Sequence, residues 1–262
     1  MTDTIDTHSL IRTAREAGDA ILEIYRQDFE IYEKQDASPL TEADLASHRI
    51  IVDALQKLTP DTPVLSEEDA DIPFAERSRW SSYWLIDPLD GTKEFIKKND
   101  EFTVNIALVE EHRPRIGVVH VPATGVTFYG ESGKGAFRIE EGETVQIHVT
   151  RPAQTPLRIA GSRSHAGSSL QTFLEKIGEY EIVSMGSSLK LCLVAEGKAD
   201  IYPRLGPTSE WDTAAAQAVV EAAGGMVTDT SGNPLLYNTK ESLLNPHFLV
   251  FGDPGRDWSG YL

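Results

Sequence analysis

The hydrophobic period of the chain changes at Pro60, and this change constrains the fold more than any other feature. From Thr7 to about Phe29 apolar residues recur at helical spacing, and a second helical pattern begins at Thr41 and ends at Pro60. After Pro60 the segments TPVLSEED, WLIDPLD, TVNIALVE, RIGVVHV and GVTFYGES have the length and composition of strands. Short Gly or Pro turns join several of them, so the sequence predicts a mixed or antiparallel sheet packed on two helices.

The second half of the chain alternates between strands and helices. The predicted order is strand LRIAGS, helix SSLQTFLEKI, strand YEIVS, helix SSLKLCLVAEG, strand ADIYPR, helix WDTAAAQAVVEAAGG, and strands around MVTD and FLVFG. We expect an α+β fold with layered αβαβα architecture. A soft boundary near Arg151 and Pro152 divides an α+β half, residues 1–150, from an α/β half, residues 151–262, within one compact unit.

Length and composition indicate an ordinary globular enzyme-sized chain of 262 residues, 40% of them apolar. Its one cysteine, Cys192, lies in the apolar helical segment LKLCLVAE, where a buried packing role is expected. No apolar run approaches the ~20 residues that span a bilayer. The opening residues MTDTIDTHSL lack the basic and apolar regions of a signal peptide, so we expect a cytoplasmic protein.

The charge balance is strongly acidic, with 24 Lys and Arg against 41 Asp and Glu and a formal net charge of −17. This balance argues against binding to DNA or RNA polymers and to an anionic membrane surface. An anionic small molecule remains possible as a substrate, because clustered carboxylates bind divalent cations that reverse the local field.

Three acidic segments stand at the ends of predicted elements: LSEEDAD with Glu67 and Glu68, DPLDGTKEF with Asp87 and Asp90, and EWDTAAA with Asp212. Taken singly, they are explained by a solvated loop, a turn and a helix cap. Together they supply the hard oxygen ligands that Mg²⁺ prefers, and two metals would share a bridging carboxylate.

The segment DPLDGT is arranged to serve such a site. Asp87 is the natural bridge, and the proline-stiffened turn directs Asp90 and the Leu89 carbonyl toward the same point. Gly91 lets the backbone approach a ligand, and the amides of Gly91 and Thr92 are expected to face phosphate oxygens.

A fourth acid, Asp44, allows two interpretations. Thr41 and Asp44 form the pattern of a capping box, and spacing alone favours this structural role. The functional alternative is a general base that, with the hydroxyl of Thr92, orients a water for in-line attack.

The combination of LSEED, WLIDPLDGTKEF and EWDTAAA resembles the lithium-sensitive, Mg²⁺-dependent phosphomonoesterases of the inositol monophosphatase superfamily. Within that superfamily the chain is most similar to the CysQ group of 3′(2′),5′-bisphosphate nucleotidases, and the resemblance covers nearly the whole chain. It implies an inositol monophosphatase-like fold, direct attack by an activated water without a covalent intermediate, and inhibition by Li⁺.

The resemblance also implies roles for individual residues. It assigns one Mg²⁺ to Glu67, Asp87 and the Leu89 carbonyl, a second to Asp87, Asp90 and Asp212, and a third, weaker Mg²⁺ near Glu67. Glu68 matches a second acid that usually lies nearby. Asp44 and Thr92 match the pair that activates water, which reverses the preference for a purely structural Asp44.

The substrate is predicted from the continuation KEF after DGT and from basic residues in the second half, which resemble the CysQ group. Lys190 and Arg204 are expected to hold a second phosphate, because cations are scarce in this chain. Their ordinary alternatives are a surface charge and a structural ion pair, and Ser187 could cap a helix. The full set of expected substrate contacts is Glu67, Leu89, Asp90, Gly91, Thr92, His165, Ser187, Lys190, Arg204 and Asp212.

The expected reaction is hydrolysis of adenosine 3′,5′-bisphosphate to AMP and phosphate, with the 3′-phosphosulfate analogue as a second substrate, in sulfur assimilation and nucleotide recycling. One alternative is an inositol-1-phosphate or sugar-phosphate phosphatase, and another is a noncatalytic nucleotide or metal sensor on the same fold. Peripheral association with the inner membrane is implied by the resemblance alone. The sequence leaves the oligomeric state open.

Overall fold

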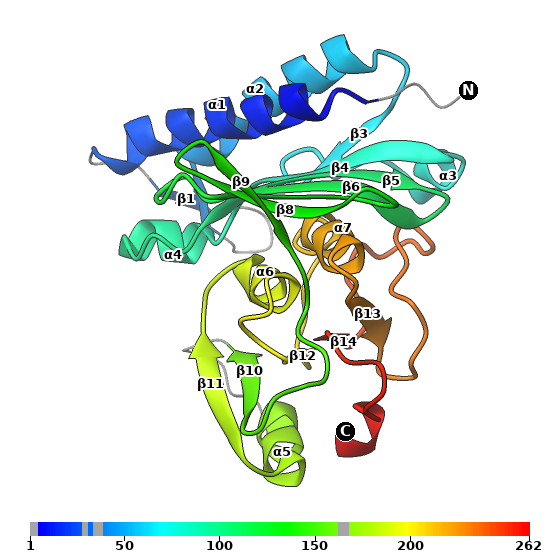
Figure 1. Ribbon diagram of the computed structural model, residues 1–262. Helices are drawn as coiled ribbons and strands as arrows, with labels where there is room; N and C mark the ends of the chain where they lie inside the picture. The colour runs from blue at the N-terminus through cyan, green and yellow to red at the C-terminus, as the bar shows by residue number, and fades with distance from the viewer. Residues whose placement is uncertain (1–4, 28–30, 34–38, 162–167) are drawn as a thin grey trace.

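Two long helices cover one face of a large sheet (Figure 1) in the computed structural model, which describes residues 5–27, 31–33, 39–161 and 168–262. They are α1 (Thr7–Tyr25) and α2 (Glu42–Leu58). Asp6 caps α1 by accepting a hydrogen bond from the His8 amide, and Thr41 and Asp44 form a capping box on α2. Between the helices, β1 (Ile31–Glu33) and β2 (Pro39–Thr41) form an antiparallel pair.

The large sheet has seven strands in the order β3-β4-β5-β6-β7-β8-β9. Only β3 and β4 pair in parallel, so the predicted mixed sheet is confirmed. The strands are β3 (Val64–Ser66), β4 (Ser82–Asp90), β5 (Thr103–Glu110), β6 (Arg113–His120), β7 (Thr127–Glu131), β8 (Gly135–Glu140) and β9 (Glu143–Ile147). Two short helices join them, α3 (Phe74–Arg77) and α4 (Thr92–Lys97).

The smaller sheet has five strands in the order β11-β10-β12-β14-β13, and each was predicted from the sequence. β10 pairs in parallel with β11 and β12, while β14 is antiparallel to both of its neighbours. The strands are β10 (Leu157–Gly161), β11 (Tyr180–Ser184), β12 (Ile201–Arg204), β13 (Met226–Asp229) and β14 (Phe248–Phe251). The helices are α5 (Ser168–Ile177), α6 (Leu189–Ala195), α7 (Ala214–Ala222) and the 3₁₀ turn η1 (Ser259–Tyr261).

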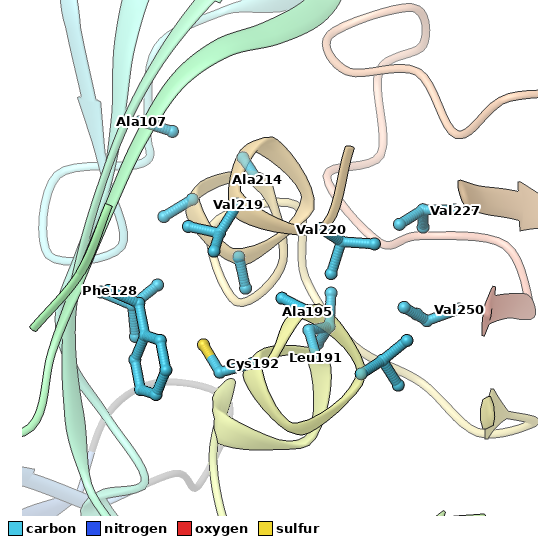
Figure 2. Packing of buried hydrophobic residues seen from close by; sticks show 14 of the residues in the cluster. Ala107, Phe128, Leu191, Cys192, Ala195, Ala214, Val219, Val220, Val227 and Val250 are labelled. Atoms are coloured by element: carbon cyan, nitrogen blue, oxygen red, sulfur yellow. The ribbon is translucent and has the colours of Figure 1, made fainter. Parts of the chain in front are cut away.

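A layer formed by α6 and α7 lies between the two sheets, and together the layers give the predicted αβαβα order (Figure 1). Figure 2 shows Val219 and Cys192 of this layer between Phe128 of the seven-stranded sheet and Val250 of the five-stranded sheet. Cys192 is buried there, as the sequence predicted. On the far side, α5 and η1 pack against the five-stranded sheet.

The soft boundary near Arg151 and Pro152 falls in the connection between β9 and β10. Because α7 from the second half packs on the first sheet, both halves contribute to one apolar core. The division into halves stays a prediction. In the part of the chain that the structure describes, no helix is long and apolar enough to cross a membrane.

Close contact between α7 and the large sheet depends on glycines in the sheet. A Cβ atom built on Gly117 of β6 would lie 2.0 Å from the Ala215 carbonyl oxygen, a distance that backbone atoms do not tolerate. Small residues on both surfaces therefore set how near α7, and the residues that precede it, come to β4 and β5.

We predict that Gly117→Ala lowers the melting temperature by roughly 5 °C, because overpacking a rigid backbone contact costs about 1–3 kcal/mol. Thermal unfolding followed by circular dichroism measures the effect. Gly206→Ala is the matched control, since a Cβ there would meet no atom within 4 Å. Equal melting temperatures for the two variants would contradict the close approach of α7.

Candidate active site

Alternation along β4 directs Asp87 toward the layer of α6 and α7. Tyr83 and Leu85 belong to the core on that side, whereas Trp84 and Ile86 pack toward α1 and α2. Asp87 continues the series of Tyr83 and Leu85, and only 1% of its surface is exposed. The apolar strand thus carries a carboxylate into the interior of the molecule.

The strand then bulges, as its pairing with β5 shows. Asp87 pairs with Asn105 and Asp90 with Thr103, so β4 has one more residue than β5 between these pairs. The amide of Leu89 donates to Asp87 Oδ1 at 3.0 Å. At the end of the turn Gly91 has φ 92°, and α4 begins at the next residue, where the sequence indicated only a turn.

Three of the predicted ligands lie together. Carboxylate oxygens of Glu67, Asp87 and Asp212 are all within 4.8 Å of one another. Glu67 and Asp87 are neighbours because Ser66 of β3 pairs with Ile86 of β4, which brings the next residue of each strand alongside the other.

Asp212 reaches the cluster from the segment before α7. Its Oδ2 accepts a hydrogen bond from the Ser209 amide at 2.9 Å, and the residue at the helix cap is Thr213. The alternative of a helix cap therefore does not explain Asp212. Asp90 stands beside the cluster, where its Oδ2 accepts from the Ser188 amide and from Thr103 Oγ1.

Burial and neighbouring negative charges raise the pKa values of Asp87, Asp90 and Asp212. The pKa of Asp87 is raised well above its ordinary value by burial and by the charges of Glu67, Asp90 and Asp212. Burial likewise raises the pKa of Asp212, and it raises that of Asp90 to about 6 although Lys190 opposes the shift.

The donor set fits a divalent cation. Asp87 Oδ2 is buried and has no hydrogen-bond partner among the described residues, although a buried carboxylate oxygen normally has one. Hard oxygen atoms at close spacing are the ligands that Mg²⁺ prefers, and a cation would offset the repulsion among these acids.

Asp44 performs the capping role and contacts Thr92 as well. The amide and the hydroxyl of Thr41 each donate to Asp44 Oδ2 at 2.7 Å, and Thr41 Oγ1 accepts from the Ala43 amide at 3.2 Å; the two bonds that involve backbone amides belong to the capping box. On the other oxygen, Thr92 Oγ1 lies 3.4 Å from Asp44 Oδ1 in donor geometry. The two interpretations of Asp44 are compatible, because they use different oxygens of one buried carboxylate.

A cavity of about 200 Å³ adjoins Asp90 and Asp212, and Ser187, Lys190 and Arg204 line it. Lys190 is only 7% exposed, so the alternative of a surface charge is wrong for it. Its Nζ donates to the Ser187 carbonyl at 2.6 Å, and burial lowers its pKa.

Two polar atoms beside this cavity are unpaired within the described ranges, namely Ser187 Oγ and Arg204 Nε. Arg204 Nη2 donates to the Pro207 carbonyl at 2.6 Å rather than to a carboxylate. Ser187 does not cap α6, which begins after Ser188. His165 lies outside the described residues.

Sequence analysis missed the groups that hold the acids in place. Thr103 and Ser188 donate to Asp90, and Ser188 Oγ also contacts Asn105 Oδ1 at 2.9 Å. Tyr202 and Phe248 line the cavity. The one local signal for these groups was in GSSLK, where Ser188 directly follows the predicted Ser187. The positions of the other residues depend on strand pairing and on packing between distant segments.

Comparison with known proteins gives a consistent match. The model of the inositol monophosphatase family matches residues 4–250. The 3′(2′),5′-bisphosphate nucleotidase CysQ of Escherichia coli strain K12 is 52% identical over 239 residues, which cover 90% of this chain and 96% of that protein.

Solved structures agree with this match. The crystal structure of CysQ from Bacteroides thetaiotaomicron has a TM-score of 0.82 and 42% identity, covering 95% of this chain and 97% of that one. An inositol monophosphatase from Anabaena has a TM-score of 0.77 and 25% identity, covering 97% and 93% of the two chains. The chain therefore belongs to the inositol monophosphatase family.

Proposed function

We propose that this chain is a Mg²⁺-dependent 3′(2′),5′-bisphosphate nucleotidase that hydrolyses adenosine 3′,5′-bisphosphate to AMP and phosphate. The 3′-phosphosulfate analogue is its second substrate, in sulfur assimilation and nucleotide recycling. The observation that carries the proposal is an acidic cluster around the buried Asp87, directly beside a cavity lined by two cations, Lys190 and Arg204. The similarity to the CysQ nucleotidase of Escherichia coli over 90% of the chain supports it.

The family is metal-dependent, and the acidic cluster suits that chemistry. In this proposal one Mg²⁺ would be held by Glu67, Asp87 and the Leu89 carbonyl. A second would be held by Asp87, Asp90 and Asp212, and a third would bind near Glu67. When bound, Mg²⁺ supplies positive charge that stabilises the phosphoryl group and lowers the pKa of water. The number of metals and inhibition by Li⁺ are parts of the proposal.

Asp44 and Thr92 act on the attacking water. Thr41 donates two hydrogen bonds to Asp44 Oδ2, which orient the carboxylate so that Oδ1 accepts from Thr92 Oγ1. Thr92 Oγ1 is also 3.4 Å from the Leu89 carbonyl oxygen. In this proposal the Thr92 proton is directed to Asp44, and the lone pairs of Oγ1 accept a hydrogen of the water. Asp44 takes up the proton by way of Thr92 as the water oxygen bonds to phosphorus and the ester bond to the 3′-oxygen breaks, and the 3′-oxygen leaves as an alkoxide that takes a proton from solvent to give the 3′-hydroxyl of AMP.

The substrate is held by groups on both sides of the acids. The Gly91 and Thr92 amides contact the reacting phosphate, and Lys190, Arg204 and Ser187 bind the 5′-phosphate and the adenosine. The unpaired Arg204 Nε and Ser187 Oγ support this assignment, since buried donors usually have partners. His165 stays a predicted contact, and a cytoplasmic location stays part of the proposal.

An inositol-1-phosphate phosphatase is the second candidate, favoured by the likeness to the inositol monophosphatase from Anabaena. A noncatalytic sensor is less well supported, because Asp44 and Thr92 lie in the contact that water activation requires.

Hydrolysis of a substrate panel in Mg²⁺ tests the proposal. We expect kcat/KM for adenosine 3′,5′-bisphosphate to exceed that for inositol 1-phosphate by at least about tenfold, because a substrate with one phosphate does not make the charge-assisted hydrogen bonds that Lys190 and Arg204 offer to a second phosphate. Faster turnover of inositol 1-phosphate would favour the second candidate. Mg²⁺ binding without turnover of any phosphate ester would favour the sensor.

Asp87→Asn tests the acidic cluster through stability. Because the folded protein raises the pKa of Asp87, its charged form destabilises the metal-free protein at neutral pH, and the amide relieves this. In EDTA we expect Asp87→Asn to melt at or above the temperature of the wild type. Mg²⁺ at about 100 times its dissociation constant should add about 2.7 kcal/mol to the free energy of unfolding of the wild type and raise its melting temperature by roughly 5–10 °C. Asp87→Asn should show no such response.

The control for this measurement is Asp19→Asn, an exposed acid on α1, which should respond to Mg²⁺ as the wild type does. A full Mg²⁺ response in Asp87→Asn would remove Asp87 from the ligand set.

Arg204→Ala tests the contact to the second phosphate. We expect KM for adenosine 3′,5′-bisphosphate to rise about tenfold or more, because hydrogen bonds to charged groups contribute about 1.5–3 kcal/mol. KM for adenosine 3′-monophosphate, which has no 5′-phosphate, should change little. Arg12→Ala on the exposed surface of α1 is the control. Equal increases for both substrates would contradict a 5′-phosphate contact.

A further inference from the structure

One face of α2 contacts two of the segments that carry the acidic cluster, namely the turn at Glu67 and the turn after Asp87. Ser47 Oγ donates to the carbonyl of Pro88 at 2.7 Å, in the turn that follows Asp87. His48 Nδ1 lies 2.8 Å from Ser66 Oγ, and Ser66 is the residue before Glu67. Ser47 and His48 are three and four residues after Asp44, a spacing that places all three side chains on one face of the helix.

We infer that Ser47 and His48 are positioning residues of the proposed Mg²⁺ site, through which α2 fixes the two ligand-bearing turns relative to each other. This inference rests on the proposed function. Neither side chain is assigned contact with metal or substrate: each acts through a hydrogen bond to a residue next to a ligand.

Ser47 acts on the peptide bond between Pro88 and Leu89. The carbonyl of this peptide accepts from Ser47, and its amide nitrogen donates to Asp87 Oδ1. With both polar atoms bonded, the peptide plane is fixed. The orientation of this peptide affects two candidate ligands. It sets the direction of the Leu89 carbonyl, which belongs to the next peptide, and it leaves the second oxygen of Asp87 for the cluster.

His48 acts on the turn around Glu67. Ser66 is 1% exposed, and its hydroxyl contacts His48 while accepting from the Glu68 amide at 3.3 Å. Ser66 therefore contacts the imidazole directly, and Glu68 is linked to it through the Ser66 hydroxyl. The Glu67 amide itself donates to the Ile86 carbonyl at 3.1 Å, so the backbone of this turn is held against β4 as well.

The Ser47 contact lies where water cannot readily replace it, whereas His48 is half-buried and lines a cavity beside Ser66. Ser47 is fully buried, and its hydroxyl bonds to a backbone carbonyl 41 residues away rather than to the preceding turn of its own helix. Losing the donor leaves the Pro88 carbonyl unsatisfied and free to rotate. A role limited to folding would lower stability without changing metal affinity, and this difference separates the two explanations.

Calorimetric titration of the metal-free protein with MgCl₂, without substrate, tests the inference. Ser47→Cys keeps the shape of the side chain with a somewhat larger atom and weakens the donor, and His48→Leu removes the imidazole. Groups that orient metal ligands typically contribute about 10- to 100-fold in affinity, and we expect Mg²⁺ binding to weaken by that factor in each variant. His48→Asn, whose amide can reach the place of Nδ1, should recover most of the affinity.

Thr127→Ala is the matched control, because it removes a buried hydroxyl on the same sheet that contacts His120. We expect it to lower the melting temperature and leave Mg²⁺ affinity unchanged. Wild-type Mg²⁺ affinity in both Ser47→Cys and His48→Leu would overturn the inference. Because the titration contains no substrate, failure of the wild type to hydrolyse the nucleotide would overturn the proposed function alone.

Discussion

Repulsion among closely spaced carboxylates is the constraint on which the rest of the site depends. Glu67, Asp87 and Asp212 present oxygens within 4.8 Å of one another, and Asp87 is 1% exposed. Like charges at this spacing repel each other, and burial raises the free-energy cost of a charged carboxylate. The acids are therefore held together by the remainder of the fold, and they become favourable together when a cation joins them.

The layered architecture holds the three acids together against their mutual repulsion. Glu67 and Asp87 leave two strands whose parallel pairing is fixed at Ser66 and Ile86, and Asp212 comes from the segment that α7 carries against the same sheet. The small residues of α7 and Gly117 allow that approach, while apolar packing of α6 and α7 between two sheets stabilises it (Figure 2). The free energy of the apolar core thus opposes the electrostatic repulsion at the site.

Much of this could be predicted from the sequence, because much of it is local. Helical spacing identified α1 and α2, and turn residues around Asp87 and Asp90 indicated both the bend and the candidate ligands. The β8–β9 hairpin was missed because β9 is exposed over most of its length and has no apolar face to detect. Ser47, His48 and Thr103 were missed because their partners are 41, 18 and 13 residues away.

The position of the two cations beside the acids couples substrate binding to metal binding. Burial raises the pKa values of Asp90 and Asp212, and Lys190 and Arg204 respectively oppose these increases, so each cation already interacts with a candidate ligand. In a chain of net charge −17, these carboxylates compete with an incoming phosphate for the same cations. Mg²⁺ bound to Asp90 and Asp212 would reduce that competition, since it satisfies the carboxylates and leaves Lys190 and Arg204 to the second phosphate. In the proposed function, the acidic cluster would disfavour anions without metal and admit an anionic substrate once Mg²⁺ is bound.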